Sequence, residues 1–403
     1  MADSTVPPPA EGAAPLELVP RLKEQGYSSE CVARRRRWVE EKTGCRLTHV
    51  GSHSIPSESM RGNVENPVGA AQVPLGVAGP LLIRGAEAVG TFYVPLATTE
   101  GALVRSYERG MATLTRAGGA CVRMHADENR VSPVFFFDDV AAAHEFSRGV
   151  SSDFELIRAE AESTTRHGKL LRLECSAIGR EVIVHFCYFT GDAQGMNMIV
   201  KATDKACRLI ADRNPGVRGF QIFSGNCSEK RASGSLFAGG KGKRVVAGAL
   251  LPEPVVKSYL HTTPRRMVEM WQHTVLGHVS AAAVGYNGHY ANGLAALFIA
   301  CGQDVANVVN ASVGVTNFEL TQEGGLYASV TLPSLTLATV GGGTNLGTSR
   351  ECLEMIGCAG GGKAAKFSEI VAATLLAGEL SMGASIASGD FVEAHETYGR
   401  NRP

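Results

Sequence analysis

Two carboxyl side chains stand in segments that otherwise consist largely of small and apolar residues. Glu100 lies in PLATTEGALVRS, and Asp304 lies in LAALFIACGQDVANVV. Because an ionised carboxylate is rarely buried without a partner, each acid is either an exposed turn residue or the partner of a cation elsewhere in the chain. Carboxyl groups that share a site with a lysine form a coupled set, and one of them can serve as an acid near neutral pH.

Two further residues could stabilise charge or transfer a proton, but each could also be a surface residue without a role in catalysis. Lys230 follows a predicted strand and turn in SGNCSEKR, residues 224–231, where a lysine is more often a surface residue. His395, in EAHETYGRNRP, would ordinarily be a solvent-exposed histidine of a C-terminal tail. Neither residue indicates catalysis by itself.

Two glycine-containing segments are typical of anion sites. GDAQGMNMIVKATDKA, residues 191–206, follows a predicted strand and opens a predicted helix, where backbone N–H groups can hold anions. It does not contain GxGxxG, so a Rossmann site is unsupported, and a glycine turn with gap-filling methionines is the alternative. GCAGGGKA, residues 357–364, nearly matches a P-loop, but Ala364 replaces the Ser or Thr that binds Mg²⁺. We therefore do not expect a nucleoside triphosphatase.

The composition excludes several classes of function. The chain has 403 residues with 39 basic and 39 acidic side chains, so it carries no electrostatic footprint for nucleic acid or anionic lipid. The one basic run, Arg34 to Arg37, lies beside Trp38 and is interpreted as a solvated helix face. The ten cysteines are scattered without CxxC or metal-like pairing, which favours reduced thiols in a cytoplasmic, metal-free protein. Neither a signal peptide nor an apolar run of roughly 18 residues is found, so we expect a soluble protein without membrane contact.

The periodicity predicts helices and strands that must position these residues. An amphipathic helix is expected in residues 17–45, and residues 136–164 have helical spacing with Asp138 and Asp139 near the start. Two strands follow, KLLRLECSAIG and REVIVHFCYFT. Together these elements predict a compact α+β unit at about residues 133–222, inserted in a larger framework. That framework has predicted helices at about 263–284, 290–311 and 363–388 and strands near 244–250 and 326–332.

Taken in order, the motifs resemble 3-hydroxy-3-methylglutaryl-coenzyme A reductase, in the soluble catalytic portion of its class I branch. The resemblance runs from about residue 62 to 400 and is carried by ENPVGAAQVPLGVAGP, PLATTEG, GDAQGMNM, SGN before an acid and Lys230, GHYAN with CGQD, TVGGGTN, and a histidine near the C-terminus.

The resemblance implies an α+β fold with three parts. A tail and short helical region would occupy residues 1–61, and a large domain built around a long buried helix would occupy 62–132 and 223–403. A ferredoxin-like small domain that binds NADPH would be inserted at 133–222. The family also implies a homodimer or higher homo-oligomer with active sites at the subunit boundary.

The implied reaction reduces an acyl-coenzyme A thioester to a primary alcohol with two NADPH in turn, releasing coenzyme A. By resemblance, Glu100 protonates the developing alcohol, Lys230 stabilises the oxyanion, Asp304 lies between them, and His395 protonates the departing thiolate. A fixed cation is needed because hydride transfer leaves negative charge on oxygen. We expect a buried Lys230 and Glu100 to share one site with Asp304.

The remaining site residues are also assigned by resemblance. For NADPH they are Asp192, Gly195, Met196, Asn197, Thr165, Arg166 and Arg400. For the thioester substrate they are Ser106, Arg109, Ser224, Glu229, Arg231, His289 and Asn292.

The acyl pocket departs from the family pattern. The family has Asp-Lys-Lys at the catalytic lysine, where this chain has Glu229-Lys230-Arg231. The family also has an Arg at the position that aligns with Val131 of this chain, and Arg130 lies one residue away. A third family cation falls near Gln272. Losing two of three cations would weaken binding of a distal carboxylate. The alternatives are therefore displaced cations for the usual substrate, a reductase of a different acyl thioester, or a non-catalytic binding protein on the same scaffold.

Overall fold

The computed structural model describes residues 17–21 and 26–389, and the chain forms two compact units, residues 1–72 and 73–403. The first unit contains helix α1 (Ser29–Thr43), helix α2 (Thr48–Gly51) and the short helix η1 (Ser57–Met60). Ser28 begins α1 because its hydroxyl accepts the N–H of Cys31, and Gly44 ends it in the left-handed conformation at φ 69°. The helix expected in 17–45 therefore begins later than predicted.

The basic run on α1 is only partly a solvated face. Arg34 and Arg37 are exposed, but Arg35 is buried and donates to the carbonyl oxygens of Pro20 (3.0 Å) and Pro67 (3.2 Å). The prediction is wrong for Arg35, because its guanidinium satisfies backbone carbonyls that would otherwise lack donors. The bond to Pro67 ties that residue to the first unit, which extends to Gln72, beyond the boundary suggested at residue 61.

The second unit contains a large, mainly antiparallel set of strands. Strand β3 (Ala120–Val131) pairs with β8 (Gly242–Leu251), which pairs with β10 (Leu326–Leu335), and β9 (Val315–Leu320) lies at the edge. The hairpin of β1 (Leu75–Arg84) and β2 (Val89–Ala97) joins β3 through a short parallel contact. The strands predicted near 244–250 and 326–332 are confirmed.

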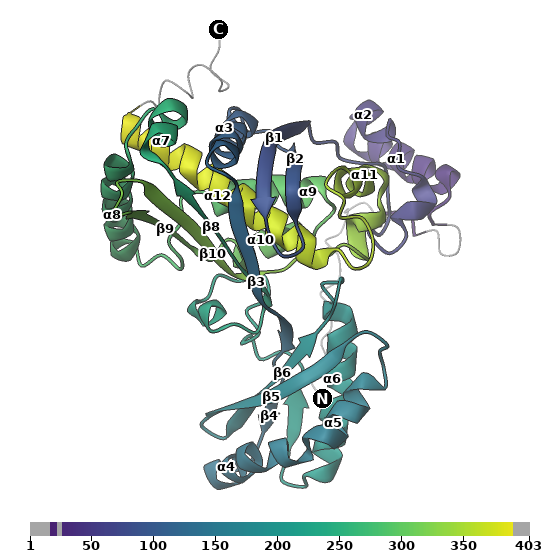
Figure 1. Cartoon of the computed structure of the whole chain (residues 1–403). Coiled ribbons are helices and arrows are strands. Elements are labelled where there is room, and N and C mark those ends of the chain that lie inside the picture. The colour runs from purple at the N-terminus through teal and green to yellow at the C-terminus, as the bar shows by residue number, and fades with distance from the viewer. Residues whose placement is uncertain (1–16, 22–25, 390–403) are drawn as a thin grey trace. The chain divides into compact units, whose positions relative to one another are not determined.

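A long helix, α12 (Ala364–Ser388), runs through the core of this unit (Figure 1). It packs against β3, β8 and β10 and against α3 (Leu103–Arg116), α8 (Pro264–Ser280) and α9 (Tyr290–Ala300). By length and a mean hydropathy of 1.6, α12 alone among the described helices could cross a bilayer, but 83% of its most apolar stretch is buried inside the protein. It therefore has the environment of a core helix, as predicted for residues 363–388. Helix α7 (Glu253–Leu260) also contacts it. The same unit contains α10 (Val308–Ala311) and α11 (Gly347–Met355), with the short helices η3 (Gly234–Ala238), η4 (Val305–Asn307) and η5 (Gly342–Asn345).

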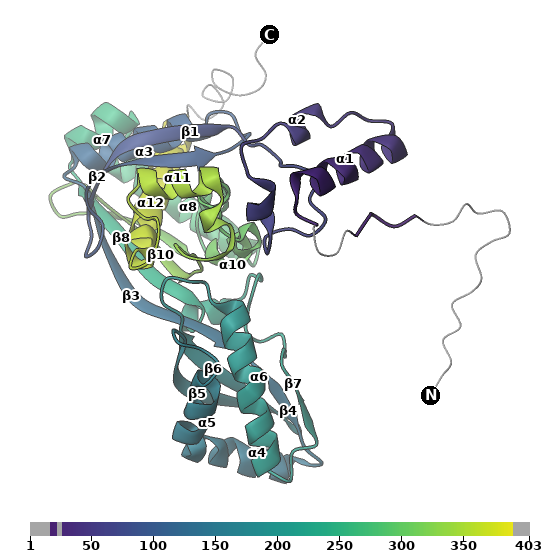
Figure 2. The same ribbon diagram turned by 90° about the vertical axis from the view of Figure 1, so that its right-hand side faces the viewer.

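A second, smaller core is built by the middle of the chain. Strands β4 (Val134–Phe136), β5 (Lys169–Ile178), β6 (Glu181–Phe189) and β7 (Gly219–Gln221) extend from the end of β3, and α6 (Met196–Arg213) and α5 (Phe154–Glu162) pack side by side along them (Figure 2). Its buried apolar residues run from Val131 to Ile210. The predicted hairpin is confirmed.

The helical stretch predicted at 136–164 is interrupted. Helix α4 (Val140–Gly149) and α5 are separated by the short helix η2 (Val150–Asp153). Asp139 caps α4 by accepting the N–H of Ala142 at 2.8 Å, as its position near the helix start suggested.

Candidate active site

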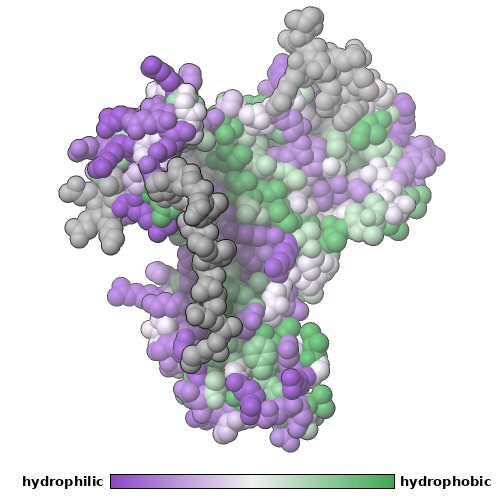
Figure 3. Space-filling model, turned by 180° about the vertical axis from the view of Figure 1, so that it is seen from behind, coloured by the Kyte–Doolittle hydropathy of each residue, from purple (hydrophilic) through white to green (hydrophobic). Residues whose placement is uncertain are grey.

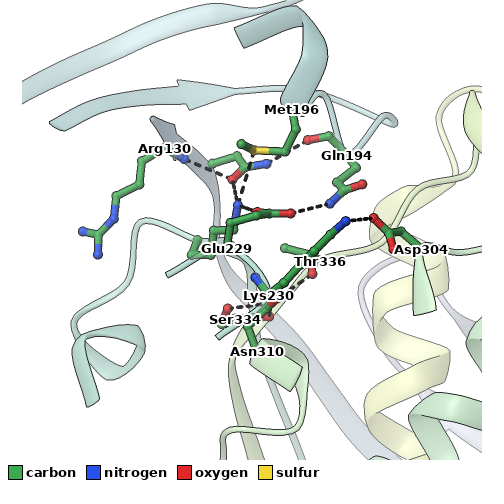
Figure 4. Close-up of polar contacts among 11 residues, drawn as sticks. Arg130, Gln194, Met196, Glu229, Lys230, Asp304, Asn310, Ser334 and Thr336 are labelled. Carbon is green, nitrogen blue, oxygen red and sulfur yellow. Dashed lines mark hydrogen bonds and ion pairs between the residues drawn. The ribbon is translucent and has the colours of Figure 1, made fainter. Parts of the chain in front are cut away.

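Lys230 and Asp304 form an ion pair, with 2.8 Å between Lys230 Nζ and Asp304 Oδ2 (Figure 4). Their side chains are 45% and 40% exposed, so the prediction of a buried lysine is wrong. Asp304 also does not interrupt a helix, because α9 ends at Ala300 and the predicted helix 290–311 is broken there. Instead, Asp304 caps η4 by accepting the N–H of Ala306 at 3.2 Å, which holds its carboxylate in place.

The loop that carries Lys230 has a strained backbone. Ser228 and Lys230 both lie in the left-handed region, with φ of 54° and 53°. Such conformations are uncommon outside glycine and persist where the surrounding structure enforces them. The buried side chain of Asn310 does so here, since its oxygen accepts the N–H of Lys230 at 3.3 Å.

Asn310 is in turn fixed by strand β10 and the segment that follows it. Its side-chain nitrogen donates to the carbonyl oxygen of Ser334 and to the hydroxyl of Thr336, each at 3.1 Å (Figure 4). The sequence analysis missed Asn310, and a buried asparagine in the apolar stretch VANVVNASV was the available signal.

Glu100 is an exposed residue of the turn between β2 and α3. Its carboxylate accepts the side-chain N–H of Asn292 at 2.7 Å. Among the described residues, no ion pair within 4.0 Å joins Glu100 to a lysine or arginine. The prediction that Glu100 is buried beside Lys230 and Asp304 is therefore wrong for the single chain, because the turn places this acid in solvent.

Five of the predicted residues line one cavity of about 640 Å³. They are Glu100, Ser106, Arg109, His289 and Asn292, and they come from α3, from α9 and from the turns that precede these helices. Lys230 and Asp304 do not line this cavity. The structure therefore divides the predicted residues between two neighbourhoods.

Helix α12 fixes the polar residues of this cavity. Arg109 donates to the carbonyl oxygen of Ser381 and to the hydroxyl of Ser385, each at 2.6 Å, and Ser106 donates to the hydroxyl of Ser381 at 3.0 Å. These bonds turn one face of α3 toward the long core helix.

Glu379, which the sequence analysis did not single out, is a buried carboxylate next to the cavity. It accepts the backbone N–H groups of Gly288 and His289, each at 2.8 Å, and the hydroxyl of Thr316 at 2.7 Å. The hydroxyl of Tyr107 lies 3.2 Å from Nδ1 of His289, and Oε1 of Glu379 lies 3.9 Å from the same nitrogen. Burial and the negative charge of Glu379 raise the pKa of Tyr107 well above its usual value, so this tyrosine is a neutral partner of the histidine.

Three of the predicted NADPH residues, Gly195, Met196 and Asn197, lie at the start of α6. Gly195 caps the helix at φ 77°, a conformation that suits glycine, and no side chain caps the N–H groups that follow. The hydroxyl of Thr165 donates to the sulfur of Met198 at 2.9 Å, which brings the 165–168 turn to the same helix end. Arg166 and Asn197 are exposed. Arg400 and the catalytic candidate His395 lie outside the described residues.

Asp192 has a different environment from that expected of a cofactor ligand. Its carboxylate accepts the backbone N–H groups of Gly362 (2.7 Å), Lys363 (3.0 Å) and Ala364 (3.0 Å) at the start of α12. Partial burial acts to raise the pKa of Asp192, but these three donors outweigh it and lower the pKa below the usual value. The P-loop-like segment 357–364 therefore does hold an anion, and that anion is Asp192.

Arg231 and Arg130 are the cations considered for a distal substrate carboxylate. Arg231 is exposed and donates to the carbonyl oxygen of Gly225 at 3.0 Å. Arg130 is buried, and Figure 4 shows its guanidinium directed away from Lys230. Glu229 is partly buried and forms an ion pair with Lys241, a residue that the sequence analysis missed, and Ser224 donates to the carbonyl oxygen of Ser132 at 2.6 Å.

In the part of the chain that the structure describes, no group of three or more His, Cys, Asp or Glu side chains could hold a metal ion. The ten cysteines are unpaired, and six of them are buried.

Comparison with known proteins places the chain in one family. The family model for hydroxymethylglutaryl-coenzyme A reductase matches residues 31–400. The 3-hydroxy-3-methylglutaryl-coenzyme A reductase of Methanocaldococcus jannaschii is 43% identical over 392 residues, which cover 95% of this chain and 96% of the relative. The enzyme of the same name from Methanothermobacter thermautotrophicus is 43% identical over 374 residues, covering 92% of this chain and 94% of the relative.

A solved structure agrees on the fold. The class II 3-hydroxy-3-methylglutaryl-CoA reductase of Streptococcus pneumoniae, bound to NADPH, superposes with a TM-score of 0.67 at 16% identity, covering 91% of this chain and all of that one. Since the family model spans most of the chain and the archaeal relatives match at nearly full length, this protein belongs to the hydroxymethylglutaryl-coenzyme A reductase family.

Proposed function

We propose that the protein reduces 3-hydroxy-3-methylglutaryl-coenzyme A to mevalonate and coenzyme A. The reaction consumes two NADPH and two protons and yields two NADP⁺, so four electrons reach the thioester carbon. Family membership supports the substrate and cofactor, and the Lys230–Asp304 ion pair is the single structural observation that carries the chemistry.

Lys230 is assigned to the carbonyl oxygen of the substrate. Each hydride addition to the carbonyl carbon leaves negative charge on this oxygen, and a fixed ammonium group lowers the energy of that state. Asp304, at 2.8 Å, orients the lysine. Glu100 is assigned the protonation of the alcohol oxygen, and His395 the protonation of the coenzyme A thiolate.

The start of α6 is proposed to hold NADPH, which supplies hydride when bound. An 18-residue helix whose first N–H groups have no side-chain cap is a suitable anion site. Exposed Arg166 adds a cation for a phosphate, and Thr165 is held beside this helix end through Met198. The residues present therefore fit the cofactor. We assign residues 133–222 as the NADPH-binding domain and residues 62–132 and 223–403 as the large domain.

A homodimer of the class I type is also part of the proposal, with active sites at the subunit boundary and a cytoplasmic location. Glu100 and Lys230 form no ion pair within one chain, so a second copy could bring the two groups together. Large apolar side chains are exposed on the second unit, including Leu276, Val279, Val305 and Val309. Figure 3 shows green hydrophobic areas among the purple ones on one face of the molecule.

A second candidate is a reductase of a different acyl thioester. Arg231 is exposed and bonded to the backbone, and Arg130 is directed away from Lys230 (Figure 4). A distal substrate carboxylate would therefore need another cation.

The decisive experiment measures NADPH oxidation with purified protein and a panel of thioesters. The panel contains 3-hydroxy-3-methylglutaryl-coenzyme A and an analogue of equal length that lacks the distal carboxylate. We expect the former to be turned over far faster, with mevalonate identified by mass spectrometry. Equal turnover of both thioesters would favour the second candidate, and no turnover of any thioester would favour a binding protein.

A variant pair tests the role of Lys230. Lys230→Ala removes the oxyanion cation, so we expect kcat to fall by about 10²- to 10³-fold. Lys257→Ala is the control, because Lys257 is an exposed lysine on α7 that pairs only with Glu253 among the described residues. Full activity of Lys230→Ala would refute the assignment.

A further inference from the structure

Lys241 is a fully buried lysine beside the loop that carries Lys230. Its side chain is 0% exposed and it directly precedes β8. Lysine is almost never fully buried unless it is paired. Here the ammonium group forms an ion pair with Glu229 and donates to the side-chain oxygen of Asn129 at 2.8 Å.

These contacts belong to a closed ring of four residues, which we name the Lys241 ring: Lys241, Glu229, Gln194 and Asn129. Gln194 donates through Nε2 to Glu229 Oε1 at 3.2 Å, and Asn129 donates through Nδ2 to the backbone carbonyl oxygen of Gln194 at 2.8 Å. Figure 4 shows Gln194 and Glu229 facing each other, with Met196 at the start of α6 close by. Each member therefore contacts the next.

The ring joins four separate segments of the chain. Asn129 belongs to β3, Gln194 to the turn before α6, Glu229 to the strained loop, and Lys241 directly precedes β8. Glu229 directly precedes Lys230, and Gln194 directly precedes Gly195, the cap of α6. The two neighbourhoods assigned to the oxyanion and to NADPH are thus tied together by one buried cation.

Removing one partner of a buried ion pair is costly, because the other charge stays buried without compensation. Loss of Lys241 would leave the carboxylate of Glu229 with only the amide of Gln194, among the described contacts, inside a partly buried site. The carboxylate would then turn toward water and take the adjacent loop with it.

We propose that Lys241 is a positioning residue that holds the Lys230 loop, through Glu229, against the N-terminal turn of α6. This proposal rests on the function proposed above for Lys230 and α6. Lys241 need not touch the substrate or the cofactor.

The test compares Lys241→Met with Lys243→Met. Lys243 is a matched control, since its side chain is only 4% exposed, it lies two residues further along the same segment, and it pairs with Asp127 at 2.9 Å. Both variants lose a buried ion pair, so both should unfold at lower urea concentration. Only Lys241→Met should lose kcat, by roughly 10- to 100-fold, with much smaller changes in both KM values.

A double variant separates positioning from general damage. If Lys241 acts through Glu229, the kcat of Glu229→Gln/Lys241→Met should be no lower than that of the poorer single variant. Multiplied losses would mean that the two residues act independently and would overturn the proposal.

Hydrogen exchange gives a readout that does not depend on turnover. The amides of residues 224–231 and 191–198 should exchange roughly tenfold faster in Lys241→Met and at the wild-type rate in Lys243→Met. Equal exchange and equal kcat in the two variants would overturn the inference. If the wild-type protein showed no thioester-dependent NADPH oxidation, the proposed function would be refuted. The exchange data would still decide whether Lys241 holds the loop.

Discussion

The side-chain oxygen of Asn310 accepts the backbone N–H of Lys230 at 3.3 Å, and Lys230 holds a left-handed φ of 53°. A lysine in this conformation costs about 1–2 kcal/mol relative to ordinary backbone. Asn310 therefore stabilises a strained loop while the ammonium group at the other end of Lys230 reaches Asp304. The lysine is held from both of its ends.

Asn310→Ala should release this loop. The substitution leaves the partly buried N–H of Lys230 and the buried carbonyl of Ser334 without their partner, so we expect the free energy of unfolding to fall by about 2 kcal/mol. We also expect kcat to fall more than KM rises. Urea unfolding and steady-state kinetics measure both effects, with Asn317→Ala as the control, because Asn317 is an exposed residue of β9. An unchanged kcat would show that the hydrogen bonds of Asn310 do not contribute to catalysis.

Ala102→Gly should stabilise the protein. Ala102 begins α3 at φ 67° without a side-chain cap, so glycine removes a left-handed penalty of about 1–2 kcal/mol. The greater freedom of glycine in the unfolded chain offsets about 0.5–1 kcal/mol of this gain. A net increase of about 0.5–1 kcal/mol in unfolding free energy is expected in urea. A decrease would contradict the strain assigned to this turn.

Asp192→Asn should weaken the junction with α12 in a pH-dependent way. The pKa of Asp192 is lowered from 3.8, so the folded state favours the charged form and gains stability above pH 3.8. This contribution is lost as the pH falls through the lowered folded pKa. We expect wild type to exceed Asp192→Asn by about 1 kcal/mol at pH 7, and the difference to shrink below pH 3.8.

The thermal unfolding of wild type and Asp192→Asn, followed from neutral to acid pH, measures this difference. A gap of constant size down to pH 2.5 would show that the charge of Asp192 is not what matters. An Asp192→Asn protein with normal KM for NADPH would further indicate that this residue anchors the turn and does not contact the cofactor.

Two buried glutamates of α12 provide a matched pair. Glu379 accepts N–H groups from Gly288 and His289 beside the cavity, whereas Glu369 accepts those of Ala86, Glu87 and Ala88 in the β1–β2 turn. Glutamine at either place turns an N–H toward a backbone donor. We therefore expect each variant to lose about 2 kcal/mol of unfolding free energy.

Only Glu379→Gln should also raise the KM for the thioester, because only Glu379 holds His289 at the cavity wall. Calorimetry and steady-state kinetics on both variants measure the two effects. Equal KM values for the thioester in the two variants would show that Glu379 does not position the substrate site.

The predicted α+β class and most element positions agreed with the structure, because they depend on local patterns. The alternation in REVIVHFCYFT and the apolar length of residues 363–388 predicted β6 and α12. The break of 290–311 was missed although a local signal was available, because Gly302 lies just after the helix end at Ala300 and takes a left-handed φ of 63°. Arg35 was misjudged for a related reason, because a carbonyl 32 residues away decides its burial.

The candidate site shows the same division between what the local sequence determines and what the tertiary structure decides. The sequence by itself determined the family and the types of residue available, because the motifs occur in a characteristic order along the chain. Tertiary structure decided which of them meet: Lys230 with Asp304, Asp192 with the start of α12, and Lys241 with Glu229. Charge pairing depends on distance in space, and partners separated by up to about 170 positions leave no periodic signal in a single sequence.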